Sequence, residues 1–461
     1  MNKAAFLMLL LSATALSIDK PAIEWVKLYE DWDKIESVIE TSDGGFAVTV
    51  LIIGVPEYSF FKLDQDGALL WGAPFDLYAQ RGKVVVELET GHFAVAGWAK
   101  ETEEASVALM VAEHDANGVE LWTKLYNSQY PGSESASSMC SLPDGGFAIC
   151  GSISPAEGMD QAWILRTDSQ GDTLWTREWG WVYNDAAMSI LYIEDGLTVL
   201  MQGNTPSTPG GPHLVRYDMD GNLLWEMQLD FPGGVTCFAQ QMCRASDGGL
   251  LVLDNYHPEI AHYDLQGNFD WYFAPPGVGE PWGWSVSTTM DGGILFGGEC
   301  ADNPERKGIC GMISRHNADG MELWRDYVYN SGCDIIYSAI QLSQGGYIAA
   351  GQANGQGYLI KYAPEMGIEE TTPSAGIEMS VFPNPCSSEL SVIFGLPEAG
   401  SASVHIYDLP GRLVSVVADG EFPSGSNTIT WTVPEGLSSG CYLVRMDTSY
   451  GHITENCVLI R

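Results

Sequence analysis

The sequence predicts an all-β protein made of a seven-bladed β-propeller that is closed by its N-terminal strand and followed by a small C-terminal β-sandwich. The main observation is a tryptophan that recurs in nearly the same local setting every 46 to 53 residues. Self-similarity at this period is typical of repeat architectures in which no single unit can bury its apolar face alone. The seven repeated residues are Trp25, Trp71, Trp122, Trp175, Trp225, Trp271 and Trp324.

One repeat contains the pattern of four short antiparallel strands. Between positions 136 and 175, apolar runs at 137–142, 147–151, 162–166 and 173–177 are separated by turns. Two of the three connections carry Asp with Gly, which suits tight hairpins that need positive φ. Four antiparallel strands in one unit predict a propeller blade. We expect the repeated tryptophans to pack between neighbouring blades as large apolar spacers.

The two ends of the repeat region predict how the ring closes. The first tryptophan strand, 23–27, has no three strands before it, and the last unit ends at residue 362 without a fourth strand. Joining them removes two exposed sheet edges that would otherwise promote association. We therefore predict a propeller over residues 18–363 in which the N-terminal strand completes the last blade.

The N-terminus and the charge indicate the compartment. Residues 1–17 have the pattern of a secretory signal peptide, and their apolar run, 4–11, is too short for a membrane anchor. No other stretch is long and apolar enough for a membrane span, and no cysteine precedes Cys140, so no lipoprotein anchor is expected. The net charge of −39 disfavours nucleic-acid partners.

Ten cysteines in a chain expected to be exported suggest disulfides. Three pairs flank predicted hairpin turns, which would place the members of each pair opposite each other. The pairs are Cys140 with Cys150, Cys300 with Cys310, and Cys441 with Cys457. Cys237 could pair with Cys243, which leaves Cys333 and Cys386 without obvious mates. No clustered Cys/His spacing predicts a metal site.

The Asp-x-x-Gly and Leu-Trp strand pattern resembles the tryptophan-docked repeat of pyrroloquinoline-quinone-type propellers over residues 23–362. Quinone enzymes of that family carry an adjacent cysteine pair. Because no two cysteines are neighbours here, the resemblance implies the blade but not the cofactor.

After a polar linker at 364–375, residues 376–461 are predicted to form an Ig-like β-sandwich. The motifs Pro-Asn-Pro at 383–385, Ile-Tyr-Asp at 406–408 and Gly-x-Tyr at 440–442 resemble the C-terminal sorting domain of type IX secretion substrates. The departures are Cys386 where an aromatic residue is usual, and Cys441 and Cys457 within strands. The resemblance implies recognition by the secretion machinery, export via the periplasm, and release or attachment at the cell surface.

The predicted binding surface is the propeller face that carries the longer connections, from the fourth strand of one blade to the first of the next. Aromatic rings among Asp, Asn and Glu on this face suit a polysaccharide, and a surface protein is the other partner considered. The alternative is that the rings cap the ends of the blade cores. The candidates are Trp32, Trp179, Trp181, Tyr183, Trp282, Trp284 and Tyr329, with the Trp-Gly-Trp pairs 179/181 and 282/284 foremost.

A second hypothesis is a secreted polysaccharide hydrolase or lyase that uses carboxylates lining the channel. Its candidates are Glu36, Glu40, Glu87 and Glu89, to which no separate acid and base roles can be given. No catalytic constellation or resident cofactor is expected. Calcium is the one ion considered, because the turns 64–67 and 218–221 resemble the start of a calcium loop. The closing Glu of such a loop is missing, which favours ordinary hairpin turns.

Overall fold

The computed structural model describes residues 20–53, 58–74, 77–130, 132–156, 158–180, 185–205, 208–229, 238–255, 258–275, 282–302, 307–328, 334–365, 378–384, 386–408, 413–434, 436–437, 440–448 and 451–459. The predicted signal peptide and most of the predicted linker lie outside these residues. The chain divides into two compact units, Met1–Glu365 and Met366–Arg461. All the regular elements are β-strands, which confirms the predicted all-β class.

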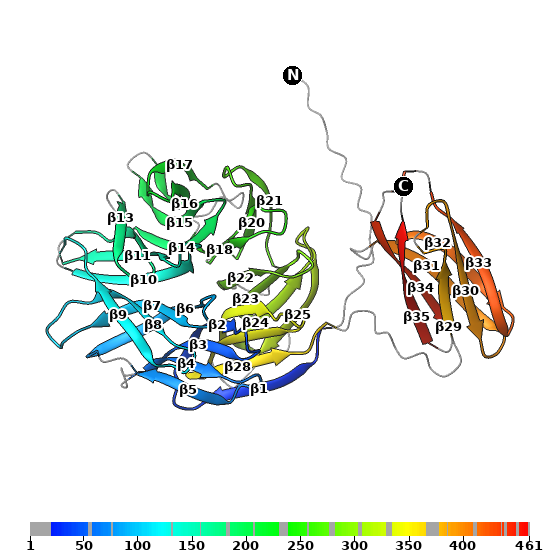
Figure 1. Ribbon diagram of the computed structural model, residues 1–461, viewed down its shortest axis with the longest axis horizontal. Helices are drawn as coiled ribbons and strands as arrows, with labels where there is room; N and C mark the ends of the chain where they lie inside the picture. The colour runs from blue at the N-terminus through cyan, green and yellow to red at the C-terminus, as the bar shows by residue number, and fades with distance from the viewer. Residues whose placement is uncertain are drawn as a thin grey trace, which may run out of the picture. The chain divides into compact units, whose positions relative to one another are not determined.

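The first unit consists of seven antiparallel sheets of four strands each (Figure 1). The first three are β2 (Lys34–Glu40), β3 (Phe46–Leu51), β4 (Tyr58–Leu63) and β5 (Leu69–Pro74); β6 (Ala79–Glu87), β7 (Phe93–Lys100), β8 (Ala108–His114) and β9 (Glu120–Tyr126); and β10 (Gly132–Ser141), β11 (Phe147–Pro155), β12 (Gln161–Thr167) and β13 (Thr173–Trp179). The next three are β14 (Ala186–Ile193), β15 (Gly196–Thr205), β16 (Thr208–Asp218) and β17 (Leu223–Gln228); β18 (Ala239–Arg244), β19 (Leu250–Asp254), β20 (Ile260–Tyr263) and β21 (Phe269–Phe273); and β22 (Trp282–Thr288), β23 (Ile294–Asp302), β24 (Lys307–His316) and β25 (Glu322–Val328). The last sheet contains β26 (Asp334–Gln341), β27 (Tyr347–Ala353), β28 (Gln356–Tyr362) and β1 (Ile23–Tyr29).

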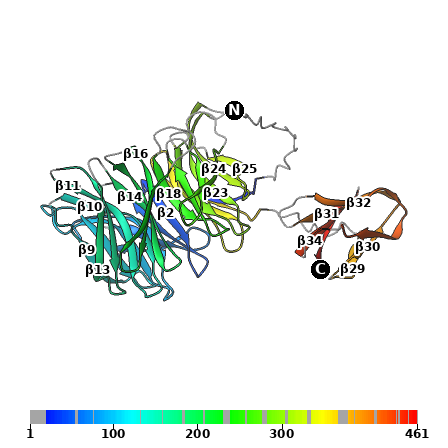
Figure 2. The ribbon, with the colours of Figure 1, turned by 90° about the horizontal axis from the view of Figure 1, so that it is seen from above.

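The last sheet joins the two ends of the repeat region. β1 pairs antiparallel with β28, with Val26 opposite Ile360 and Tyr29 opposite Gly357. The first strands of successive sheets contact one another from β2 to β26, and β26 in turn contacts β2. Figure 1 shows these sheets arranged around a common centre, which is the propeller arrangement, and Figure 2 shows the same sheets edge-on. Seven sheets of four strands fit the predicted number of blades.

The repeated tryptophans dock each fourth strand onto the next sheet. The ring of Trp71, on β5, covers Gly118 in the turn between β8 and β9, where an added Cβ would lie 2.5 Å from the indole. Gly118 has φ of +81°, so glycine is required there both by the backbone and by the ring. The same contact joins Trp25 to Gly67, Trp122 to Gly171, and Trp175 to Gly221. β1 therefore docks like the other fourth strands.

The repeat is degenerate at two junctions. Met227 lies against Gly267, and Phe273 lies against Gly320, in place of the tryptophan of the strand. Trp271 instead stacks on His262, with ring centroids 5.0 Å apart and an interplanar angle of 9°. A large apolar group still covers each turn glycine, so the junction is preserved although the residue that makes it changes.

The aspartate of each Asp-x-x-Gly turn organises its own hairpin. Asp168 Oδ1 accepts hydrogen bonds from the backbone N–H groups of Gln170 and Asp172, at 2.9 and 2.8 Å. The pattern recurs at the turns headed by Asp64, Asp115, Asp218, Asp264 and Asn317. Hydrogen bonds from Asn222 and the backbone hold the pKa of Asp218 below its usual range. The turn chemistry accounts for these aspartates without a bound ion.

The second unit is built from two sheets, β29–β30–β33 and β32–β31–β34–β35, as Figure 2 shows. The strands are β29 (Glu378–Phe382), β30 (Glu389–Leu396), β31 (Gly400–Asp408), β32 (Leu413–Phe422), β33 (Gly425–Thr432), β34 (Gly440–Thr448) and β35 (Gly451–Leu459). Alternating residues of β30 and β31, such as Val392, Phe394, Val404 and Ile406, share one buried core. Two sheets around one core are the arrangement of a β-sandwich.

The cysteine registers correct two of the three predicted pairings. Cys140 lies opposite Ala148, and Cys150 lies opposite Ser138, because the hairpin is centred one residue earlier than the sequence suggested. Cys140 and Cys150 are free thiols within one apolar core. Burial raises the pKa of the Cys140 thiol to about 12, which makes it unreactive.

The C-terminal pairing is wrong for a related reason. Cys441 lies opposite Val458 and Cys457 lies opposite Tyr442, so the register of the hairpin is offset by one residue from the one that would pair the two cysteines. The sulfur of Cys457 instead lies 3.4 Å from the sulfur of Cys386. In the remaining pair, Cys300 does lie opposite Cys310, and a disulfide between them stays a prediction.

Candidate functional site

Every first strand of the seven sheets contains a β-bulge at an equivalent place. In β2, for example, the register shifts between Ile35 and Ser37, which leaves Glu36 as the extra residue. A bulge re-aims the extra side chain and increases the local twist. The seven bulged residues are Glu36, Lys83, Ser137, Met188, Gln240, Trp284 and Tyr337.

The glycine that ends the second-strand motif makes this bulge possible. A Cβ added to Gly97 would lie 1.8 Å from the carbonyl oxygen of Arg81, the residue two before bulged Lys83. Gly151 and Gly351 would clash in the same way with the carbonyl oxygens of Ser135 and Ile335, at 1.8 and 1.9 Å. The bulged backbone therefore approaches its partner strand so closely that only glycine fits.

The bulged residues converge on a cavity of about 350 Å³. All seven line it, together with neighbours on the same first strands, notably Lys34 and Arg81. Because the first strands form the inner ring of contacts, this cavity occupies the centre of the propeller. Two of its lining residues, Lys34 on β2 and Trp284 on β22, lie at or near the starts of their strands, on the side that receives the connections from the fourth strands.

A charged network fills one side of the cavity. Arg81 Nε donates to Glu36 Oε2 at 2.8 Å, and Arg81 Nη2 donates to Glu36 Oε1. Lys34 Nζ lies 2.7 Å from the same Oε1. Burial opposes ionisation of Glu36, but the hydrogen bonds and charges of Arg81 and Lys34 outweigh it and hold its pKa below the usual range. One carboxylate is thus shared by two cations.

Lys83 is a third cation that this network does not neutralise. Its side chain lines the cavity and forms no ion pair or side-chain hydrogen bond with the described residues. Burial lowers the pKa of Lys83, and the charge of Glu36 opposes that shift. The described residues of the cavity lining therefore carry three cationic groups and one carboxylate, in a chain with 60 acidic and 21 basic residues.

Aromatic rings form the other side of the cavity. The ring centroids of Trp284 and Tyr337 lie 5.3 Å apart in an edge-to-face contact, and Lys34 Nζ lies 4.8 Å from the Tyr337 centroid. Trp282, which is 37% exposed, is stacked with Trp284 at 6.4 Å and 21°. The indole Nε1 of Trp284 is buried without a hydrogen-bond partner. An unpaired buried donor is unusual and is available to a ligand.

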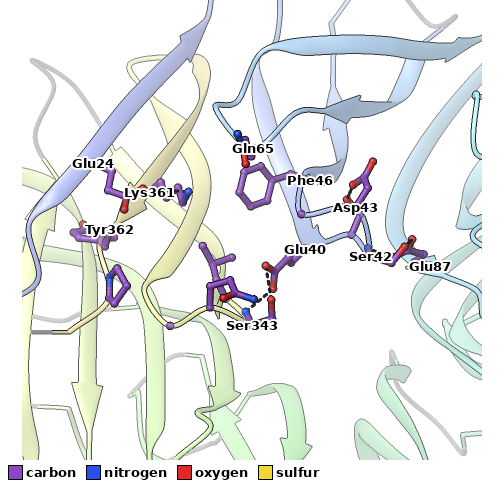
Figure 3. Close-up of a pocket in the computed structure, with 16 residues that line it drawn as sticks. Glu24, Glu40, Ser42, Asp43, Phe46, Gln65, Glu87, Ser343, Lys361 and Tyr362 are labelled. Atoms are coloured by element: carbon purple, nitrogen blue, oxygen red, sulfur yellow. Dashed lines mark hydrogen bonds and ion pairs between the residues drawn. The ribbon is translucent and has the colours of Figure 1, made fainter. Parts of the chain in front are cut away.

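A second, larger groove of about 650 Å³ lies between the last sheet and the first, beside the Asp-Gly turns (Figure 3). Its charged side chains are already paired. Glu40 accepts hydrogen bonds from the backbone N–H and hydroxyl of Ser343, and Glu87 accepts the same pair from Ser42. Glu24 lies 3.1 Å from Lys361. These contacts join neighbouring turns, so we assign the groove a structural role.

The structure thereby separates the four carboxylates of the hydrolase or lyase hypothesis. Of these four residues, Glu36 alone lies in the central cavity. Glu40 and Glu87 line the groove beside the Asp-Gly turns, and Glu89 is exposed. The expectation that all four line the channel is wrong, because the register of each first strand directs only its bulged end to the cavity.

The structure places the predicted aromatic site residues in different environments. Trp284 lines the cavity, and Trp282 is stacked on Trp284 without lining the cavity itself. Trp32 is only 5% exposed and is stacked on Tyr29 at 4.1 Å, and Trp179 is 8% exposed and donates from Nε1 to Glu226 at 3.3 Å. These two are core residues, which corrects their assignment to the binding surface. Trp181, Tyr183 and Tyr329 lie outside the described residues.

Sequence reasoning missed Lys34, Arg81, Lys83 and Tyr337. Lys83 and Tyr337 are bulged residues, and a bulge breaks the alternation that assigns the residues of a strand to its two faces. An alignment of the seven repeats on their Asp-Gly turns would have revealed the signal. The bulged position would stand out as a column of seven different residues inside an otherwise regular strand.

In the described part of the chain, no group of three or more His, Cys, Asp and Glu side chains could hold a metal ion. The same residues include no helix long and apolar enough to cross a membrane.

Comparison with known proteins supports the division into two units. Residues 380–460 match the family described as the secretion system C-terminal sorting domain. The chain ends in a sorting domain. It is therefore exported by the type IX route and is either secreted or held at the cell surface. Within this sorting domain, the match includes the three motifs on which the resemblance was based.

The first unit is similar in structure to solved propeller proteins. Streptogramin B lyase is 13% identical, with a TM-score of 0.51, and the match covers 74% of this chain and 98% of the lyase. Virginiamycin B lyase from Staphylococcus aureus is 12% identical, with a TM-score of 0.53, and the match covers 74% and 99%. At these identities the likeness concerns the fold alone. No curated protein matches the chain in sequence.

Proposed function

We propose that this protein is an exported binding protein whose first unit is a closed seven-bladed propeller that engages a polysaccharide at its central cavity. The observation that carries the proposal is Trp284 in the cavity lining, with the ring of Trp282 stacked on it. One ring is exposed and the other has an unpaired buried N–H. Sugar rings offer C–H faces for stacking and hydroxyl oxygens that accept such a hydrogen bond.

Export limits the partners that the propeller can meet. A sorting domain delivers the propeller to the cell surface or the medium, where polysaccharides and surface proteins are the accessible partners. The sheets supply a rigid frame, and the binding groups project from the bulges of seven different strands. This division between a regular scaffold and variable projecting residues is typical of binding proteins.

The test is retention of the purified full chain on insoluble polysaccharides, together with a glycan array. We expect retention on at least one glycan, and a tenfold or greater loss in the Trp282→Ala/Trp284→Ala variant. Tyr272→Ala is the matched control, because Tyr272 is 42% exposed on β21, outside the cavity lining. Absence of retention on every glycan, or equal retention by the double variant, would contradict the proposal.

The same samples test the enzymatic alternative. Release of new reducing ends or unsaturated products, lost in Glu36→Gln, would favour a hydrolase or lyase. Among the described residues, Glu36 is the one carboxylate in the cavity lining, and that group is held ionised by Arg81 and Lys34. Two independently placed carboxyl groups are needed for the common glycosidase mechanisms, so we expect binding without turnover.

A further inference from the structure

The charge of the central cavity identifies the ligand more closely than its aromatic rings do. Lys34 and Arg81 share the carboxylate of Glu36, while Lys83 has no charged partner among the described residues. Two positive charges therefore remain unbalanced in a half-buried space. Holding an unpaired charge away from water is costly, and an anionic ligand group would remove that cost.

The surroundings of Lys83 suggest what carries the anion. Lys83, Trp284 and Tyr337 are all bulged residues, so their side chains are directed to the same cavity from β6, β22 and β26. Trp284 contributes a free N–H, and its stacked neighbour Trp282 extends the aromatic surface to solvent. The site thus combines a cationic interior with an aromatic exit. That combination suits an acid group on a chain of sugar rings better than a free inorganic ion, which would leave the rings unused.

We propose that the cavity binds the acid group of an anionic glycan, either a uronate carboxylate or a sulfate ester, with Lys83 as the charge partner and the Trp282–Trp284 pair under the adjoining sugar. This inference rests on the proposed function and narrows it to one ligand class. The acidic exterior of the chain makes the cavity a local exception, because an anionic glycan is repelled elsewhere. Binding is therefore confined to the place where the three cations gather.

Calorimetric titration of the full chain with three oligosaccharides of equal length tests the inference. The probes are an oligogalacturonate, a sulfated galactan oligosaccharide, and a neutral galactan oligosaccharide. We expect at least one anionic probe to bind tenfold or more tightly than the neutral one, and the two anionic arms separate carboxylate from sulfate. Raising the salt concentration should weaken binding of the anionic probe and leave binding of the neutral probe almost unchanged.

Lys83→Met should reduce binding of the anionic probe at least tenfold, because the side-chain volume is kept and the charge is lost. Lys124→Met is the matched control: it removes one lysine charge on the outside of the propeller, where Lys124 pairs with Asp172. That control should stay within twofold of the parent. Lys83→Met should also melt at the same temperature as the parent or higher, since it removes a buried unpaired charge. A folded Lys83→Met variant that binds the anionic probe normally overturns the inference.

The outcomes separate this inference from the proposed function. Equal binding of neutral and anionic probes, abolished by Trp282→Ala/Trp284→Ala, overturns the anionic assignment and leaves the polysaccharide proposal standing. Binding of none of the probes, together with no retention on any glycan, overturns both. Binding of free sulfate alone, lost in Lys83→Met, overturns the glycan assignment and identifies the cavity as a small-anion site.

A separate observation concerns the sorting domain. The sulfurs of Cys386 and Cys457 lie 3.4 Å apart, and both residues are buried, at 2% and 0% exposure. We infer that these two thiols form a disulfide during export. In two exchange steps the two thiols pass two electrons and their two protons to the disulfide of a thiol oxidase, whose S–S bond breaks to give a dithiol. The bond would link the segment before β30 to β35, the last strand.

Mass spectrometry of tryptic peptides from exported protein tests this bond. The chain is alkylated under denaturing, non-reducing conditions, and we expect a linked peptide containing Cys386 and Cys457, which separates on reduction. Cys140, a free and half-buried thiol in the propeller that lies opposite Ala148, is the internal control and should be alkylated without reduction. Full alkylation of Cys386 and Cys457 without reduction overturns the inference.

Discussion

The outermost and innermost strands of the propeller use the same repeat in opposite ways. On the fourth strands, equivalent positions carry equivalent groups, as where Trp25, Trp71, Trp122 and Trp175 each cover a turn glycine of the next sheet. At the bulge of the first strands, the seven equivalent positions carry seven different residues. Repetition marks the contacts that every junction needs, and divergence at a shared position marks the residues that are free to bind a ligand. Four experiments test this contrast.

The largest effect should come from removing β1. Deletion of residues 20–29 exposes the edge of β28 and removes the docking of Trp25 on Gly67. We expect a loss comparable to the whole stability of a domain, about 5–15 kcal/mol, with association of the exposed edges. Thermal denaturation and light scattering measure the two effects. Lys27→Ala, which keeps the strand, is the control. A deleted chain that remained monomeric with an unchanged melting temperature would refute closure by β1.

A single docking tryptophan should have the next largest effect. Trp71→Ala removes the ring that covers Gly118 and contacts Phe60 and Phe93. Loss of a packed tryptophan costs about 3 kcal/mol or more. Denaturant unfolding followed by fluorescence measures it. Leu69→Ala, on the same strand and 55% exposed, should change the unfolding free energy by less than about 0.5 kcal/mol. Similar values for the two variants would mean that the tryptophan is not a junction residue.

His316, which lies near the docking contact of Phe273, should make stability depend on pH. Burial lowers its pKa from 6.5 to about 4, and the charges of Arg325 and Arg315 act in the same direction, against a hydrogen bond to Gly320. Between pH 6.5 and 4 the unfolded chain binds the proton and the folded chain does not, so stability falls as the pH falls through this window.

From pH 7 to pH 5 the cost is on the order of 2 kcal/mol for this one histidine. His316→Gln should reduce the pH dependence of the unfolding free energy by about that amount. Denaturant unfolding at the two pH values gives the comparison, with Lys27→Ala as a variant that should follow the parent. An unchanged slope in His316→Gln would show that the histidine is not held neutral.

The smallest effect on stability is expected in the groove beside the Asp-Gly turns. Glu40→Gln and Ser343→Ala each disrupt an exposed contact between neighbouring turns. Exposed charged hydrogen bonds contribute about 0.2–1 kcal/mol, so a double-mutant cycle should give a coupling energy within that range. Neither substitution should alter ligand binding, because the groove is structural. A loss of glycan retention in Glu40→Gln would move the binding site from the cavity to this groove.

Much of the fold could be predicted from the sequence because the patterns that indicate it are local. The Asp-x-x-Gly turns, the four short strands and the tryptophan period each depend on residues close together in the chain, and the unmatched ends at 23–27 and 362 indicated how the ring joins. The Pro-Asn-Pro and Gly-x-Tyr motifs indicated the sorting domain, which the family match supports. Local hydrogen bonds and backbone requirements determine such features, so a single sequence carries them.

The site depended on the tertiary structure. Lys34, Lys83 and Tyr337 lie on three different first strands and come together at one cavity, where Lys83 and Tyr337 are bulged residues and Lys34 is their neighbour in the lining. The same limit explains the errors: Trp32 and Trp179 resemble exposed loop aromatics until their packing is known, and a one-residue difference in hairpin register separated Cys441 from Cys457. Facing direction and register arise from packing across strands, and these are quantities that no local pattern specifies.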